Sequence, residues 1–166
     1  MISFGTLRSP VGSIGIVSDG TAITRVGWRA TPPAGASDDV DADPLLHEAL
    51  GQLAAYFAGA LRRFALPVDL GRQTATTRAV LSALYDRVGY GQSVTYGELA
   101  ALSGTAVPAR GIGSIMGANP LPIIVPCHRV LASDGLGGYS GGAPGEGLVT
   151  KRALLELEGT LPASLF

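Results

Sequence analysis

The sequence predicts an α+β protein with two parts. A small N-terminal α/β domain with an antiparallel sheet is expected over residues 1–73, and a mostly helical C-terminal domain with a helix-turn-helix over residues 74–166. Short apolar runs separated by turn signals, which are typical of strands, fill residues 2–28. After residue 74, apolar residues recur at helical spacing and capping signals flank them. A chain of 166 residues can bury a sizeable core, as one domain or as two small ones.

Three short strands are predicted at the N-terminus, over residues 2–8, 13–18 and 21–28. Residues 9–12 (SPVG) form a turn signal between the first two strands. Asp19-Gly20, between the second and third, is a dipeptide that favours tight hairpins. This order predicts an antiparallel sheet.

A solvated loop and one helix follow the three strands. Residues 31–43 contain two prolines and four aspartates, which is typical of a loop. Asp43 can cap a helix that Pro44 opens and Gly59 ends, with its apolar face formed by Leu46, Leu50, Leu53 and Phe57. Residues 64–70 are interpreted as a returning strand, and His47 as a solvated helix residue. We expect packing rather than chemistry from this domain.

The C-terminal domain opens with three predicted helices. Residues 76–88 form the first, with Val80, Leu84 and Val88 buried. Thr95 and Glu98 fit a capping box, which predicts a helix from Tyr96 to about Leu102. Pro108 opens the next helix, which ends near Ala118 before Asn119-Pro120. Two short helices joined by a glycine-containing turn indicate a helix-turn-helix, although a plain packed hairpin has the same pattern.

The second of these two helices is unusually rich in glycine. Gly111, Gly113 and Gly117 lie inside it, and each costs about 1 kcal/mol relative to alanine. Bare backbone at Gly111 and Gly113 suits close approach, either by a neighbouring helix or by a nucleic-acid groove. Arg110 is the only long charged side chain on this helix.

Residues 121–130, LPIIVPCHRV, hold the only cysteine of the chain beside one of its two histidines. Residues 123–125 are predicted to form a short buried strand that ends at Pro126. Cys127 would then lie on a stiff turn next to His128. An imidazole near a thiol increases the nucleophilic thiolate fraction. The alternative is that Cys127 is a small buried apolar residue.

The C-terminal end combines a flexible loop and a last helix. Residues 135–147 are glycine-rich and contain Tyr139 and Ser140. Thr150 is expected to cap a helix over residues 151–158, which Gly159 ends. Glu158 shares a side of this helix with two leucines, so its carboxylate is either a buried partner for His128 or a surface charge.

Composition excludes several classes of function. A net charge of −1 gives no support to generic nucleic-acid binding, so any DNA contact must depend on local geometry. One cysteine permits neither an internal disulfide nor a cysteine-rich zinc site. The first residues lack the pattern of a secretory leader, and no run is long enough to span a membrane, so we expect a cytoplasmic protein. We expect no metal and no cofactor.

Together these segments resemble the O6-alkylguanine-DNA alkyltransferases, also called methylated-DNA–protein-cysteine methyltransferases. The matching stretch, from Tyr96 to Gly159, contains YGELAALSG, ARGIGSIMGANP, PIIVPCHRV, GYSGG and KRALLELEG. The first 75 residues resemble the family only in general layout. Residues 76–82, TTRAVLS, depart from the Phe-Gln start and the Val-Trp pair that are usual there, and residues 143–147 resemble an insertion.

The resemblance implies an irreversible, single-turnover transfer of an alkyl group from O6-alkylguanine in DNA to Cys127. His128 would take the thiol proton through a water, Glu158 would steady His128, and Asn119 would link the recognition helix to the active-site turn. Further residues would form the guanine pocket: Met116, Val130 through its carbonyl, Tyr139 and Ser140. Others would contact DNA through the minor groove: Tyr96, Ala109, Arg110, Gly111 and Gly113.

The resemblance also implies the partner, which is double-stranded DNA carrying O6-alkylguanine. The nucleotide would be rotated out of the duplex, with Tyr96 crowding its 3′ phosphate and Arg110 filling the gap. We expect a monomer in solution that can assemble cooperatively on DNA, and no contact with membranes.

Three alternatives come from other classes of protein. The first is a hydrolase or acyltransferase with Cys127, His128 and Glu158 as its triad, which would need an oxyanion hole and would turn over. The second is a non-catalytic lesion-binding relative, but such relatives lack the cysteine. The third is a helix-turn-helix regulator, for which a helix with one arginine is poorly equipped to read bases.

Overall fold

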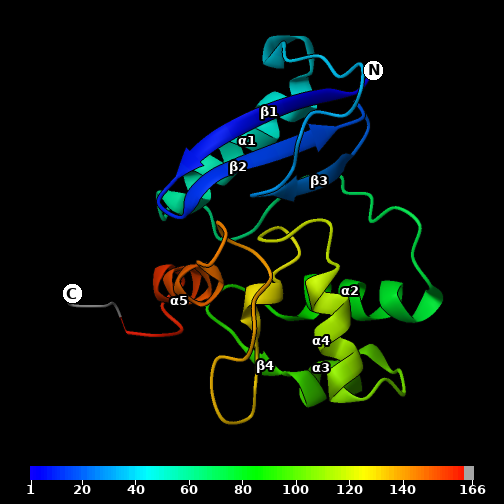
Figure 1. The fold of residues 1–166 in the computed structure, drawn as a ribbon, viewed down its shortest axis with the longest axis vertical. Coiled ribbons are helices and arrows are strands. Elements are labelled where there is room, and N and C mark those ends of the chain that lie inside the picture. The colour runs from blue at the N-terminus through cyan, green and yellow to red at the C-terminus, as the bar shows by residue number, and fades with distance from the viewer. Residues whose placement is uncertain (163–166) are drawn as a thin grey trace. The chain divides into compact units, whose positions relative to one another are not determined.

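The computed structural model describes residues 1–162 and confirms the α+β class (Figure 1). It divides into two compact units, Met1–Gly71 and the part from Arg72 onward. The last four residues of the predicted C-terminal domain, 163–166, lie outside the described residues. Within residues 1–162, none of the helices has the length and apolar character needed to cross a membrane.

The first unit is built on an antiparallel three-stranded sheet in the order β1-β2-β3. The strands are β1 (Ser3–Ser9), β2 (Gly12–Ser18) and β3 (Ile23–Gly27), so the three predicted strands are confirmed with end shifts of one or two residues. Ile14 and Ile16 of the central strand are fully buried. The sheet therefore forms one side of the core of this unit.

Helix α1 (Pro44–Phe57) packs against this sheet (Figure 1). The side chain of Asp43 accepts hydrogen bonds from the backbone N–H groups of Leu45 and Leu46, as the predicted cap requires. The buried face differs in part from the expected one and consists of Leu46, Ala49, Leu53 and Tyr56. Leu50 and Phe57 lie at its edge and are half-buried.

Two segments around α1 complete the unit. A 3₁₀ turn, η1 (Val40–Ala42), precedes the helix inside the predicted loop. The strand predicted over residues 64–70 is wrong, because this segment makes only an isolated bridge between Val68 and Ile23. Ile23 donates to the carbonyl of Pro67 at 2.8 Å and accepts from Asp69 at 3.0 Å. Pro67 has no N–H, so it cannot extend a ladder.

The second unit is mostly helical, as predicted. Its elements are α2 (Ala75–Arg87), β4 (Val94–Thr95), α3 (Tyr96–Ser103), α4 (Ala109–Gly117), η2 (Cys127–Arg129), β5 (Val130–Leu131) and α5 (Gly147–Leu157). The capping box of Thr95 and Glu98 is confirmed, and Gly104 ends α3 in the left-handed conformation with φ 68°. Helices α2, α3 and α4 pack on one another around the fully buried Leu84, Leu99 and Ile112.

Two features of this unit differ from the prediction. A short parallel pair joins β4 to β5 and connects the start of α3 to the chain just after Cys127. Helix α5 starts at Gly147 rather than after a cap at Thr150. Thr150 lies inside the helix and is buried, so its hydroxyl takes no part in capping.

Candidate active site

The segment before Cys127 is a buried turn and not the predicted strand. Ile123 and Ile124 form the turn, and Pro122 and Val125 face each other across it. Ile123 has φ 74°, which is a true outlier for a β-branched residue and costs about 1–3 kcal/mol. Hydrophobicity alone does not separate a buried strand from a buried turn, and the burial itself was predicted correctly.

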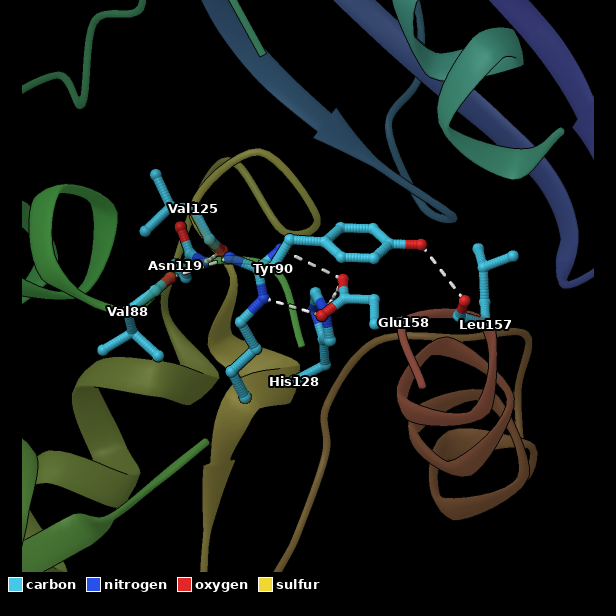
Figure 2. Close-up of polar contacts among 8 residues, drawn as sticks. Val88, Tyr90, Asn119, Val125, His128, Leu157 and Glu158 are labelled. Atoms are coloured by element: carbon cyan, nitrogen blue, oxygen red, sulfur yellow. Dashed lines mark hydrogen bonds and ion pairs between the residues drawn. The ribbon is translucent and has the colours of Figure 1, made fainter. Parts of the chain in front are cut away.

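Asn119 holds this turn through both ends of its side-chain amide. Its Nδ2 donates to the carbonyl of Val125 at 2.9 Å (Figure 2). Its Oδ1 accepts from the N–H of Leu121 at 3.0 Å. These bonds satisfy backbone groups that have no strand partner. The end of α4 is thereby fastened to the chain that leads into Cys127.

Cys127 opens the 3₁₀ turn η2 and is 6% exposed. Burial raises the pKa of its thiol, and this effect outweighs a hydrogen bond from Asn119, the positive charge of Lys151 and a hydrogen bond from Tyr139, which all favour the thiolate. The resting thiol is therefore protonated, and a nucleophilic reaction of Cys127 needs a base.

His128 follows Cys127 on η2, and its imidazole is fully buried. Its Nε2 is 2.7 Å from Oε2 of Glu158, the residue that ends α5 (Figure 2). An ionised carboxylate only accepts, so a neutral imidazole carries its proton on Nε2 and a lone pair on Nδ1. Nδ1 is buried and has no hydrogen-bond partner among residues 1–162. The site thus contains a buried base with a free lone pair, one residue after a protonated thiol.

The pKa values of His128 and Glu158 favour a neutral imidazole beside an ionised carboxylate. Burial lowers the pKa of His128, and the charges of Arg129 and Lys151 add to the effect, while Glu158 opposes it. Burial alone would raise the pKa of Glu158. Hydrogen bonds from His128 and Arg129, together with their charges, overcome burial and lower it to about 2. At neutral pH we therefore expect an ionised Glu158 and an uncharged His128.

Arg129 is a part of this site that the sequence analysis missed. Its Nε donates to Oε1 of Glu158 at 2.8 Å, and its Nη2 to Oε2 at 3.1 Å. Its Nη1 donates to the carbonyl of Val88 at 2.8 Å, and its guanidinium carbon lies 6.0 Å from the centre of the Tyr90 ring. Tyr90 donates its hydroxyl to the carbonyl of Leu157 (Figure 2). The available signal for Arg129 in the sequence was its position directly after His128 in an apolar segment.

Lys151 was also missed and is fully buried. Its ammonium donates to the carbonyls of Val130 at 2.7 Å, Leu136 at 2.5 Å and Gly138 at 3.0 Å. Burial lowers its pKa to about 8. Helical spacing carried a signal here, because Lys151 stands three, four and seven residues before Leu154, Leu155 and Glu158, all on the buried side of α5.

A pocket of about 330 Å³ opens onto Cys127. Six of the predicted site residues line it, together with Gly117 and Gly138: Tyr96, Gly113, Met116, Cys127, Tyr139 and Ser140. Ser140 donates its hydroxyl to the carbonyl of Gly117 at 3.4 Å, which joins the loop after η2 to the end of α4. The pocket therefore lies between α3, α4 and that loop.

The other predicted site residues lie outside the pocket lining. Ala109 and Arg110 are exposed at the start of α4, and the Arg110 side chain makes no hydrogen bond or ion pair within the described part of the chain. A Cβ on Gly111 would lie 2.6 Å from the side chain of Val107, in the segment just before α4, so a close contact with this segment already explains the glycine. Val130 is buried and its carbonyl accepts from Lys151. Within residues 1–162, no group of three or more His, Cys, Asp or Glu side chains is arranged to hold a metal.

Two family models match the chain. The model described as "6-O-methylguanine DNA methyltransferase, DNA binding domain" matches residues 75–160. The model described as "6-O-methylguanine DNA methyltransferase, ribonuclease-like domain" matches residues 2–70. Between them they account for both units.

Similar proteins and structures agree with these matches. The methylated-DNA–protein-cysteine methyltransferase of Mycobacterium tuberculosis is 39% identical over 160 residues, which cover 95% of this chain and 93% of that protein. A crystal structure of an O6-methylguanine methyltransferase from the same organism superposes with a TM-score of 0.81 at 37% identity, covering 99% of this chain and 98% of that one. A structure of the mycobacterial protein in complex with DNA also gives 0.81, at 39% identity, over 97% and 96% of the two chains.

Proposed function

The chain belongs to the 6-O-methylguanine DNA methyltransferase family, and we propose that Cys127 is the residue on which its activity depends. The protein repairs alkylated DNA by transferring an alkyl group from the DNA to a cysteine of its own. Cys127 is the only cysteine in the sequence. Its position at a pocket of about 330 Å³, one residue before a buried histidine that is paired with Glu158, is the observation that carries the assignment.

The transfer begins with deprotonation of the thiol. The Nδ1 lone pair of His128 takes the proton of Cys127, through a bridging water, and Glu158 stabilises the resulting imidazolium through Nε2. The thiolate attacks the alkyl carbon, the C–S bond forms and the bond between that carbon and O6 breaks. The guanine leaves as its anion, with Tyr139 donating a hydrogen bond to it. Solvent supplies the proton that neutralises the guanine, and the imidazolium returns its own proton to solvent. The product is a thioether, which has no good leaving group, so each molecule acts once.

The pocket supports a substrate base that has left the duplex. A base cannot meet a buried thiol while it is stacked, so the nucleotide must rotate out of the helix. Met116 supplies an apolar wall, and Ser140 supplies a polar contact for the edge of the guanine. The carbonyl of Val130, which the resemblance also assigns to the guanine, is buried outside the pocket lining and accepts from Lys151. Tyr96, at the first turn of α3, stands at the pocket where it can crowd the 3′ phosphate.

We propose that the partner is double-stranded DNA carrying O6-alkylguanine and that α4 enters its minor groove. The exposed Ala109 and Arg110 are at the end of α4 that would lead, and Gly113 leaves room above the pocket. Two of the cations of the second unit, Arg129 and Lys151, are buried and cannot reach phosphates. Affinity for undamaged DNA should therefore be modest and depend weakly on salt. A monomer that works in the reducing cytoplasm fits a thiol that has to remain free.

Incubation with an excess of duplex DNA carrying labelled O6-methylguanine tests the proposal. We expect labelled methyl groups on the protein to reach a plateau at one per molecule, and Cys127→Ser to abolish labelling. Several methyl groups released per protein molecule would instead favour a Cys-His-Glu hydrolase.

A further inference from the structure

The carboxylate of Glu158 pairs with both His128 and Arg129. Only His128 takes part in the proposed proton transfer. Oε2 of Glu158 is 2.7 Å from Nε2 of His128 and 3.1 Å from Nη2 of Arg129, and Oε1 accepts from Nε of Arg129 at 2.8 Å. The carboxylate side chain is completely buried and that of Arg129 is 8% exposed. Solvent therefore screens these charges little. His128 faces a neutral ion pair and not a bare carboxylate.

This pairing matters because the charge of a bare carboxylate would favour uptake of a proton from solvent by the imidazole. An opposite charge within hydrogen-bonding distance favours the imidazolium, and an imidazolium has no lone pair with which to take the proton of Cys127. The guanidinium, itself cationic and adjacent, counteracts that effect. We propose that Arg129 is a positioning residue of the alkyl transfer, which offsets the charge of Glu158 and so keeps His128 an uncharged base at neutral pH. This inference rests on the proposed function of Cys127.

The surroundings of Arg129 support a fixed role. Its third nitrogen is held by the carbonyl of Val88 at the end of α2, and Tyr90 lies under the guanidinium. The hydroxyl of Tyr90 bonds the carbonyl of Leu157, one residue before Glu158. Figure 2 shows Tyr90 reaching toward Leu157 while the Glu158 carboxylate faces His128. The segment after α2 and the end of α5 thus hold both members of the ion pair.

The other charged and titratable groups near His128 are few. Cys127 lies beside it on η2, Lys151 reaches the site from α5, and Tyr139 approaches the thiol from the loop after η2. Lys151 is fully occupied by three carbonyls, so it cannot take over the pairing of Glu158. Arg129 is therefore the cation whose removal leaves the charge of Glu158 without a counterion.

The test is the pH dependence of transfer from O6-methylguanine DNA, together with NMR titration of the imidazole of His128. In Arg129→Met the carboxylate loses its counterion, so the acid limb of the rate profile and the imidazole titration should both move to higher pH, by about 1–3 units. Arg129→Lys retains the charge and should keep the limb near its wild-type position despite a lower rate. A second histidine, His47 on α1, is exposed and supplies a reference signal in the same spectra.

A double variant separates charge from structure. Adding Glu158→Gln to Arg129→Met removes both charges, so the acid limb should return toward its wild-type position. Glu158→Gln alone leaves the guanidinium unopposed and should move the limb to lower pH. This pair of variants measures the effect of Arg129 even if Arg129→Met does not fold. Arg152→Met, an exposed change one residue after Lys151, is the matched control.

If the acid limb of the pH–rate profile stays in place in Arg129→Met while the rate falls, the inference is overturned and Arg129 is purely structural. The same holds if Glu158→Gln and the double variant have limbs at the same pH. A wild-type protein that transfers no alkyl group would overturn the proposed function instead. The imidazole titrations need no substrate and would still decide the role of Arg129.

Discussion

Replacing Lys151 by methionine should loosen the wall of the pocket and destabilise the second unit. The ammonium donates to three carbonyls, at 2.7 Å to Val130, 2.5 Å to Leu136 and 3.0 Å to Gly138. Val130 is 1% exposed, so water cannot replace the donor that its carbonyl loses, which costs about 1–3 kcal/mol. Leu136 and Gly138 are more exposed, and water can replace their bonds. Methionine fills the space of the lysine stem and avoids burying a charge.

We therefore expect the free energy of unfolding, measured by urea denaturation, to fall by about 1–3 kcal/mol. Alkyl transfer should slow by about tenfold or more, since Gly138 and its neighbour Tyr139 line the pocket and lose their anchor. Amide hydrogen exchange should rise over residues 136–140. Arg152→Met, with a side chain that is 53% exposed, should change stability by no more than about 0.5 kcal/mol. Wild-type stability, exchange and transfer in Lys151→Met would refute this reasoning.

Three further predictions address the DNA contact, the acid stability and the shape of the pocket. Arg110→Ala should slow repair of duplex DNA by about tenfold to a hundredfold, because a lost stacking contact costs a few kcal/mol, and should leave transfer from free O6-benzylguanine unchanged; equal losses on both substrates would make Arg110 structural. The pKa of Glu158 is lowered from 4.5 to about 2, so its ionised form stabilises the fold fully above pH 4.5, and this contribution is lost as the pH falls toward 2. Urea midpoints measured over that range should fall in the wild type and stay flatter in Glu158→Gln, and parallel curves would contradict the assignment. Gly147→Ala would place a Cβ 2.5 Å from the carbonyl oxygen of Tyr139 and should slow transfer from duplex DNA and from the free base alike. Gly135→Ala, whose Cβ would meet nothing within 4 Å, should leave transfer unchanged. The same transfer rate in both variants would count against a fixed position for Tyr139.

Local signals in the sequence predicted most elements of the fold. Asp43 with Pro44, and Thr95 with Glu98, satisfy backbone donors of the residues that follow them, so the starts of α1 and α3 depend on neighbours in sequence. The wrong predictions concern segments whose structure depends on side-chain contacts that apolar character does not reveal. The turn at Ile123 is held by the amide of Asn119, and apolar character alone indicated a strand there.

The start of α5 failed for a similar reason. Thr150 is a favourable cap in isolation, but the structure buries it against Gly142, where an added Cβ would lie 2.5 Å from its hydroxyl oxygen. Tertiary packing thus overrides the local preference, and the helix gains a turn from Gly147.

The candidate site was predictable where a motif carried it. Pro126 to Val130 pointed to Cys127 and His128, and helical spacing placed Glu158 on a side that could reach them. The resemblance supplied the pocket residues. The roles of Arg129 and Lys151 were not predicted, because burial of a cation depends on carbonyls and carboxylates far along the chain. Composition does not contain that information.

The most direct measurement is the mass of the protein and of its peptides after reaction with an excess of DNA carrying O6-methylguanine. We predict a single added methyl group, located on the peptide that contains Cys127, and an amount of repaired guanine equal to the amount of protein. Repair that exceeds the amount of protein with no lasting mass change, or a methyl group on any other residue, would contradict irreversible transfer to Cys127.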